Sequence, residues 1–299
     1  MRVLYIAKHG QTNSNDDEGA ISHALEVLGH TVISVREQEA NRVDLQSICA
    51  DLLICHGWND LATMRSVQHM PRAFWFFDRI EDPDPSLVNR NRHRIKWARE
   101  ITNVTDIGFC TDGDWVEKDT SGKLHWLTQG ADERVVGRGT ALRMPQPPIL
   151  ITASTINGGE RRRSFISDFK ERWGASVQVV ERGAHGKVMA DLMASVKVVV
   201  APQHPSSNMY WSNRVYQALG FGAFLLHPRC SGLSGQYKTT GWMYDDEQHL
   251  DALLNKDIAL HNQRWTKNMA EFLQVETTKN HLYLHRVELL LAIVKEKLG

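Results

Sequence analysis

Met144-Pro145-Gln146-Pro147-Pro148 interrupts the chain near its middle, and strands and helices are predicted to alternate on both sides of it. Three prolines within four residues cannot continue a helix or a central strand, and they suit a stiff connector. Before it, the strand-like runs Val3–Ala7 and Thr31–Val35 flank a helical pattern at Gly19–Leu28, which predicts a βαβ unit and a parallel sheet. After it, the pattern begins again with a strand at Ile149–Ala153. The sequence therefore predicts an α/β protein of two Rossmann-like domains facing across a cleft.

The expected domains are 1–144, a proline-rich linker at 145–148, a second domain at 149–279 and a C-terminal helix at 280–299. Leu282–Leu298 has the apolar spacing of an amphipathic helix, which we expect to pack back toward the N-terminal domain. The other predicted strands are Asp51–Cys55, Ala73–Phe77, Asp106–Cys110, Val177–Val180, Val196–Ala201 and Ala223–Leu226.

The composition is that of a packed globular protein, with 42% hydrophobic and 23% charged residues. Lys plus Arg equals Asp plus Glu at 35 each, so the overall charge predicts no polyanionic partner. The four cysteines form no CxxC pair and indicate reduced thiols in a cytoplasmic protein. Met1–Ala7 is too short an apolar run for a signal peptide or a membrane span.

The most specific stretch runs from Pro205 to Leu226 and contains Ser207, Asn208, Asn213 and Arg214. This stretch is predicted to contain the end of a strand, a polar loop, a helix that starts near position 212 and another strand. Free N–H groups at a helix start favour an anion, and an arginine offers a forked cation to a diphosphate. An ordinary connection carrying a surface arginine explains the same spacing, so both interpretations stay open.

The segment Asn213-Arg214-Val215-Tyr216-Gln217 resembles the donor-domain signature Asn-Arg-x-x-Glu of GT-B glycosyltransferases, especially the spore-maturation-protein-like branch (glycosyl transferases group 1, family four-like). Residues 124–132 resemble the segment that closes the N-terminal domain of such enzymes. Asn280–Arg286 resembles the His-Thr-Tyr-x-x-Arg element that opens their last helix. The resemblance covers nearly the whole chain in the right order.

This resemblance implies an acceptor-binding first domain and a second domain that binds a nucleotide diphosphate sugar, with UDP-glucose as the simplest donor. It implies no cofactor and no metal ion, and it favours retention of anomeric configuration. Gln217 stands where the family has a glutamate that accepts hydrogen bonds from the donor's ribose, and Met209 stands at another usually acidic position. These departures imply weaker donor binding, a different donor, or a non-catalytic protein on a decayed scaffold.

The resemblance also implies donor contacts in the loops that follow strands of the second domain. Gly158 and Arg161 follow the first of these strands, and Arg161 is the arginine expected near the phosphates, although a solvated helix start explains it too. Arg182 and Gly183 follow the second strand, where backbone groups of such enzymes hold the nucleobase.

Polar residues after strands of the first domain are candidates for the acceptor side. His9, Gly10 and Trp58 are expected near the acceptor or the transferred sugar, and His56 and Asp78 are the candidate catalytic groups. A carboxylate or an imidazole is the group that deprotonates a hydroxyl. Asp78 as a turn cap is an equally good reading.

Two Asp-x-Asp segments, Asp82-Pro83-Asp84 and Asp112-Gly113-Asp114, resemble a metal motif of the other major glycosyltransferase fold. We interpret both as turn chemistry. The basic run Asn89–Arg99 indicates a solvated helix face or, with Trp97 available for stacking, a nucleic-acid contact.

The acceptor stays open among a small molecule, a glycan, a protein and a hydroxylated base in DNA, which would have to be extruded from a duplex. A nucleotide-sugar epimerase is a further alternative for a chain with two Rossmann-like domains. The absence of a first-loop GxGxxG argues against an NAD-dependent dehydrogenase.

Overall fold

The computed structural model describes residues 1–8, 17–56, 61–137, 146–153, 159–180, 186–202, 207–255 and 263–299. The chain forms two compact units, and each is described here by itself. Unit 1 comprises Met1–Asp82, Val88–Gly130 and Tyr283–Gly299, and unit 2 comprises Pro83–Leu87 and Ala131–Leu282. The chain thus passes into unit 2 after Gly130, upstream of the proline-rich stretch expected to be the linker.

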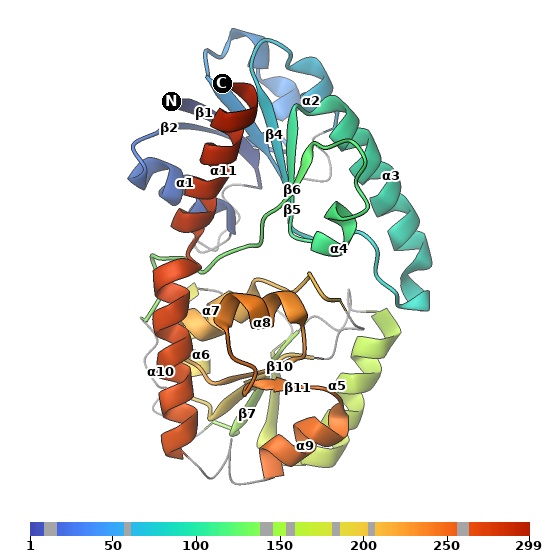
Figure 1. Ribbon diagram of the computed structural model, residues 1–299, viewed down its shortest axis with the longest axis vertical. Helices are drawn as coiled ribbons and strands as arrows, with labels where there is room; N and C mark the ends of the chain where they lie inside the picture. The colour runs from blue at the N-terminus through green and yellow to red at the C-terminus, as the bar shows by residue number, and fades with distance from the viewer. Residues whose placement is uncertain are drawn as a thin grey trace. The chain divides into compact units, whose positions relative to one another are not determined.

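Unit 1 contains a parallel sheet with the strand order β2-β1-β3-β4-β5-β6 among its described residues (Figure 1). Its strands are β1 (Arg2–Ala7), β2 (Thr31–Arg36), β3 (Leu52–Cys55), β4 (Arg72–Phe76), β5 (Ile107–Cys110) and β6 (Leu124–Trp126). The strands β1, β3 and β4 are nearly continuous apolar runs because helices cover both faces of the sheet.

The two faces of this sheet carry different helices. These are α1 (Asp17–Val27), α2 (Leu61–Ser66), α3 (Val88–Val104), α4 (Gly113–Val116) and α11 (Tyr283–Leu298). Alternate residues of β1 point to opposite faces. Val3 and Tyr5 join the core formed with α1 and α11, whereas Leu4 and Ile6 join the core formed with α2 and α3.

The C-terminal helix α11 is part of unit 1 although it lies at the far end of the sequence. Tyr283, Val287, Leu290 and Val294 form one buried stripe of this helix and pack in the same core as β1 and α1. Burying each aliphatic side chain stabilises the unit by about 1.5–3 kcal/mol. Figure 1 shows α11 beside α1. The predicted amphipathic helix and its return to the N-terminal half are confirmed.

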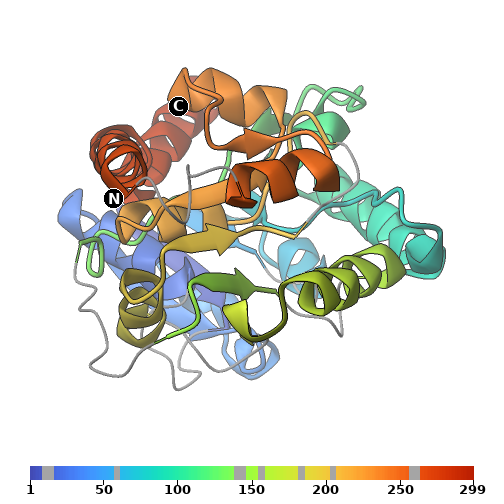
Figure 2. The same ribbon diagram turned by 90° about the horizontal axis from the view of Figure 1, so that it is seen from below.

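Unit 2 contains a second parallel sheet, with the order β11-β10-β9-β7-β8 among its described residues. Its strands are β7 (Ile149–Thr152), β8 (Val177–Val180), β9 (Val198–Val200), β10 (Leu225–Pro228) and β11 (Met243–Tyr244). Figure 2 shows these strands with helices around them. The helices are α5 (Gly159–Trp173), α6 (Gly186–Ala194), α7 (Arg214–Gly220), α8 (Ser231–Tyr237), α9 (Glu247–Asn255) and α10 (Gln263–Asn280). Short 3₁₀ turns occur in unit 2 at Pro85–Leu87 and Gly174–Ser176, and in unit 1 at Ala40–Arg42 and Leu45–Ser47.

The strand predicted at Ala223–Leu226 begins two residues later, at Leu225, because Ala223 takes part in the cap that follows the last residue of α7. Gly222 has φ +78° and donates its N–H to Leu219 O at 3.0 Å, while Ala223 N donates to Ala218 O at 3.0 Å. These two bonds form a Schellman cap, which needs a left-handed residue and therefore favours glycine. Within the part of the chain that the structure describes, no helix is long and apolar enough to cross a membrane.

Candidate functional site: polar groups at the strand ends of each unit

In unit 1, His56 follows β3 directly and lies among polar and aromatic side chains. Its Nε2 atom is 3.3 Å from the Tyr5 hydroxyl and 3.4 Å from Glu18 Oε1. Phe77, which follows β4, packs edge-on against the imidazole with 4.8 Å between ring centroids. The His56 side chain is 4% exposed and that of Glu18 is 16% exposed. A carboxylate at this distance can orient the ring and stabilise its protonated form.

A second layer of polar groups surrounds this pair. Burial and the neighbouring carboxylates of Asp17 and Glu18 raise the pKa of the Tyr283 hydroxyl well above its usual value. Gln129 Nε2 donates to Asp17 Oδ2 at 3.0 Å, and Arg286 Nε donates to the Gln129 carbonyl at 3.1 Å. The start of α11 therefore contributes Tyr283 and Arg286 to the strand-end region of unit 1.

Asp78, the other candidate catalytic group, follows β4 and lies beside α3. Its Oδ2 accepts a hydrogen bond from Arg94 at 3.0 Å, and its side chain is 47% exposed. Arg94 also donates to the Arg79 carbonyl at 2.6 Å. The carboxylate of Asp78 is thus held by an arginine from α3, an arrangement that fixes its position.

Asp112, in one of the Asp-x-Asp segments, follows β5 and is 1% exposed. Its Oδ2 accepts a hydrogen bond from Ile80 N at 2.8 Å. Burial raises the pKa of this carboxyl despite that bond and the nearby Arg79 charge. Among the residues that the structure describes, no group of three or more His, Cys, Asp or Glu side chains is arranged to hold a metal ion.

In unit 2, three of the predicted donor residues, Asn213, Arg214 and Gln217, lie at the start of α7. The helix begins at Arg214, whose N–H faces Ser212 Oγ at 3.4 Å. Asn213 is the N-cap residue, although its side chain does not cap the helix. Gln217 follows one turn later, and Asn213, Arg214 and Gln217 are all half-buried. They lie on the side of α7 opposite its buried residues.

The loop before α7 is held by the start of α8. The Asn208 carbonyl accepts the Gly232 N–H at 2.8 Å and the Cys230 thiol at 3.1 Å. A Cβ on Gly232 would stand 2.9 Å from that carbonyl oxygen, so only glycine fits there without a shift. Ser207 is buried and its Oγ accepts the Met209 N–H at 3.3 Å.

The N-terminus of α5 is occupied by a protein carboxylate from another part of unit 2. Asp84 Oδ2 accepts the Arg161 N–H at 3.1 Å, and Ser86 Oγ accepts the Glu160 N–H at 3.0 Å. Gly159 permits this approach, since it has φ +73° and its Cβ would clash with Asp84. Burial acts to raise the Asp84 pKa, but hydrogen bonds from Ser86 and Arg161 and the Arg161 charge lower it overall.

Several predicted contacts cannot be placed in this way. His9, Gly10, Trp58, Gly158, Arg182 and Gly183 lie outside the described residues. Arg161 is exposed in the first turn of α5, and its role toward phosphate stays a prediction.

Sequence reasoning missed three partners that the fold supplies. Glu18 reaches His56 from α1, Arg94 reaches Asp78 from α3, and Asp84 reaches the start of α5. Glu18 lies in the first turn of the helix after β1, a position that faces the strand ends in a βαβ unit, so its position was the available signal. Asp84 was interpreted only as turn chemistry. It does form that turn, accepting the Ser86 N–H at 2.9 Å, in addition to capping α5.

Comparison with known proteins extends this picture. Residues 146–292 match the sequence model of the family described as Glycosyl transferase-like. No curated protein matches the chain.

Solved structures match the chain over its whole length at low sequence identity. The N-terminal domain of Candida albicans trehalose-6-phosphate phosphatase has a TM-score of 0.68 at 8% identity, covering 100% of this chain and 97% of that one. An α,α-trehalose-phosphate synthase (UDP-forming) from Burkholderia vietnamiensis has a TM-score of 0.65 at 10% identity, covering 99% and 97%. An alpha-glucosyltransferase in complex with UDP and a 13-mer DNA has a TM-score of 0.64 at 10% identity, covering 99% and 100%.

The structural likeness shows the fold, which is the GT-B arrangement of two parallel-sheet Rossmann-like domains, as predicted. The family match in the second half of the chain confirms the predicted enzyme class, a glycosyltransferase, while the spore-maturation-protein-like branch stays a prediction.

Proposed function

We propose that this protein transfers a hexose or related sugar from a UDP-linked donor to an acceptor hydroxyl, with retention of configuration and without a bound metal ion. The observation that carries the proposal is the start of α7, where the half-buried residues Asn213, Arg214 and Gln217 share one side of the helix. This segment lies inside the region of the family match. A UDP-forming synthase and a UDP-bound glucosyltransferase among the structural neighbours support the choice of UDP.

In unit 2, Arg214 would pair with the diphosphate, because a guanidinium offers two parallel N–H groups to phosphate oxygens. The same charge would stabilise the diphosphate as it leaves the sugar, which is where an electrostatic contact accelerates the reaction. Gln217 would replace the family's glutamate at the ribose hydroxyls. Its amide can accept one hydrogen bond and donate another, without the strength that a carboxylate adds.

In unit 1, His56 and Asp78 are the proposed groups on the acceptor side. Each has a partner that fixes it, Glu18 for the imidazole and Arg94 for the carboxylate. A fixed and oriented base is better prepared to take a proton from a hydroxyl than a mobile one.

The test is a thermal-shift titration with nucleoside diphosphates and nucleotide sugars, run with and without EDTA, on the wild type and Arg214→Ala. Arg264→Ala is the matched control, because Arg264 is an exposed arginine on α10 of the same unit. A ligand at about 100 times its Kd stabilises the folded state by about 2.7 kcal/mol. We expect a selective shift with uridine nucleotides that survives EDTA and Arg264→Ala but is lost in Arg214→Ala. No shift with any nucleotide would refute the proposal.

A second candidate is a non-catalytic nucleotide-sugar-binding protein, which Gln217 and Met209 favour. The sulfur of Met209 lies 3.0 Å from the place of a Cβ on Gly232, so this side chain packs on the α8 segment. Donor hydrolysis distinguishes the two candidates. An active wild type whose turnover is lost in Arg214→Ala supports the transferase, whereas nucleotide binding without any turnover supports the binding protein.

A further inference from the structure

The helix α3 presents a row of cationic side chains to solvent. Arg92, His93, Lys96 and Arg99 are all exposed, whereas Ala98 and other residues of the opposite side are buried in unit 1. The spacing of the row follows the helical repeat, so these side chains share one side of the helix over about 10 Å of its axis. The row stands out because the chain as a whole has a formal net charge of zero.

The other arginines of α3 are neutralised by partners at the strand ends. Arg90 pairs with Asp82 at 3.1 Å, and Arg94 pairs with Asp78 at 3.0 Å. Both arginine side chains are largely buried, at 28% and 17% exposed. These two cations therefore fix α3 to the sheet and are not part of the exposed row.

The exposed row is only weakly compensated. Glu100 is the sole carboxylate within α3, and it is contacted by Lys96 at 3.9 Å and by Arg65 of α2 at 3.5 Å. For Arg92 and Arg99, no ion pair is formed with any other residue that the structure describes. The row thus keeps a net positive charge available to a ligand.

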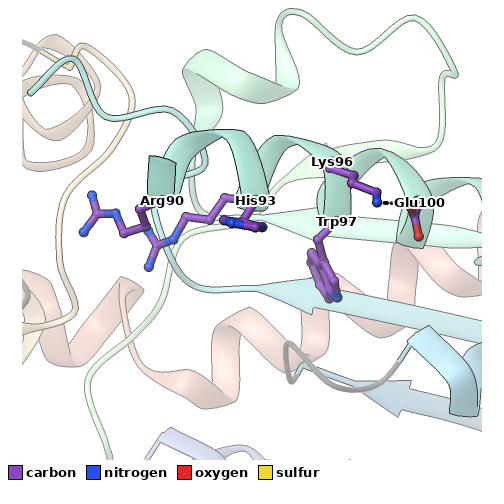
Figure 3. A pocket seen from close by; sticks show the side chains of 6 residues that line it. Arg90, His93, Lys96, Trp97 and Glu100 are labelled. Atoms are coloured by element: carbon purple, nitrogen blue, oxygen red, sulfur yellow. Dashed lines mark ion pairs between the residues drawn. The ribbon is translucent and has the colours of Figure 1, made fainter. Parts of the chain in front are cut away.

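A hollow of about 520 Å³ lies along this helix, lined by Arg90, His93, Arg94, Lys96, Trp97 and Glu100 (Figure 3). Trp97 points away from Lys96 in this view. Its ring packs against Phe74 and Phe76, with centroids 4.8 and 5.2 Å apart. Trp97 is therefore half-buried, with one side of its ring against the core, and its availability for base stacking stays a prediction.

We propose that this row binds the phosphate backbone of duplex DNA that carries the acceptor hydroxyl on a hydroxylated base. The inference rests on the proposed transferase function and names its substrate class. Proteins that bind single strands combine cations with exposed aromatic side chains, whereas the ring of Trp97 is half-buried against Phe74 and Phe76. The major groove of B-form DNA is about 12 Å wide and admits an α-helix. The major groove of duplex RNA is too narrow for one.

Two other polyanions fit the row less well. A membrane-binding helix exposes an apolar face next to its cations, but the apolar face of α3, with Ala98 and Ile101, is buried in the core. An acidic protein would need complementary shape, whereas a regular row of cations matches a regular row of phosphates. Contacts of this kind position a duplex without reading its sequence.

The test measures fluorescence anisotropy of a labelled duplex of mixed sequence between 50 and 200 mM salt (about the range over which such contacts are lost). Three phosphate contacts predict a slope of log K on log salt of about −2.7 and a loss of affinity of about 40-fold over that range. Arg92→Gln/Lys96→Gln/Arg99→Gln should abolish most of this binding and flatten the slope. Arg264→Gln/Lys267→Gln/Lys279→Gln is the matched control on α10, since its three cations are equally exposed and the change of net charge is identical.

Two further measurements separate the possible outcomes: competition between duplex DNA and other polyanions, and the thermal shift with a uridine nucleotide. Tighter binding of single-stranded DNA, duplex RNA or anionic vesicles than of duplex DNA would overturn the inference, as would equal weakening by the α10 control. If the triple variant unfolds, Arg92→Gln and Arg99→Gln should each reduce the slope by about one. A uridine-nucleotide thermal shift in the α3 variant would show that its donor site is intact. DNA binding without nucleotide binding would refute the proposed function, and nucleotide binding without DNA binding would refute only this inference.

Discussion

Replacing Asp84 with alanine should destabilise unit 2 by removing the carboxylate at the start of α5. This carboxylate accepts the Arg161 N–H at 3.1 Å and the Ser86 hydroxyl at 2.7 Å. It is 3% exposed, so water cannot easily replace it in the substituted protein. Loss of a helix cap costs about 1 kcal/mol, and loss of a negative charge at a helix N-terminus costs about 0.3–1 kcal/mol. With the partners left unpaired, we expect a total of about 2 kcal/mol.

The pH dependence of this contribution has a defined sign. The Asp84 pKa is lowered in the folded protein, so its stabilising effect is fully present above the pKa of the unfolded chain and is lost as the pH falls through the folded pKa. The stability difference between the wild type and Asp84→Asn should be constant above about pH 5 and should shrink below about pH 4.

The assay is thermal unfolding at several pH values together with hydrogen exchange of the α5 amides. A destabilisation of 2 kcal/mol should lower the Tm of a unit of this size by about 4–8 °C and speed exchange in the first turn of α5. Asp168→Ala is the control, because Asp168 is an exposed aspartate of the same helix. An Asp84→Ala protein whose Tm and α5 exchange equal those of Asp168→Ala would refute the reasoning.

Three further predictions each concern a single residue. Glu18→Gln should lower kcat about tenfold while leaving nucleotide-induced stabilisation unchanged, because Glu18 orients His56 in unit 1; steady-state kinetics and the thermal shift would check this. Gly222→Ala should cost about 1–2 kcal/mol in denaturant unfolding, and more than Gly29→Ala, because only the former adds crowding to a positive φ. Maleimide should label Cys49 alone among the cysteines of the native protein, as mass spectrometry would show, since the other three are buried.

The sequence determined the alternation of elements because apolar runs and helical spacing are local signals. The parallel sheets and the stripe of α11 follow from short stretches read in order. The observed strand limits differ from the predicted ones by one or two residues. At β10, the cap that ends α7 sets the first residue of the strand. The proline-rich stretch lies between the two α/β halves. The chain enters unit 2 before it, at Ala131, because that residue pairs with Leu282 and donates its N–H to the His281 carbonyl.

What the sequence by itself determined about this protein is its two α/β halves; the donor-binding role of the start of α7 and the catalytic roles of His56 and Asp78 stay predictions from it. Only the tertiary structure decided the partners of those groups, since Glu18 and Arg94 approach them from helices distant in sequence. It also packs one side of the Trp97 ring against Phe74 and Phe76 and leaves Arg92, Lys96 and Arg99 of α3 exposed. Residue type sets what a side chain can do, but the packing of helices on sheets sets which charges meet and which stay exposed.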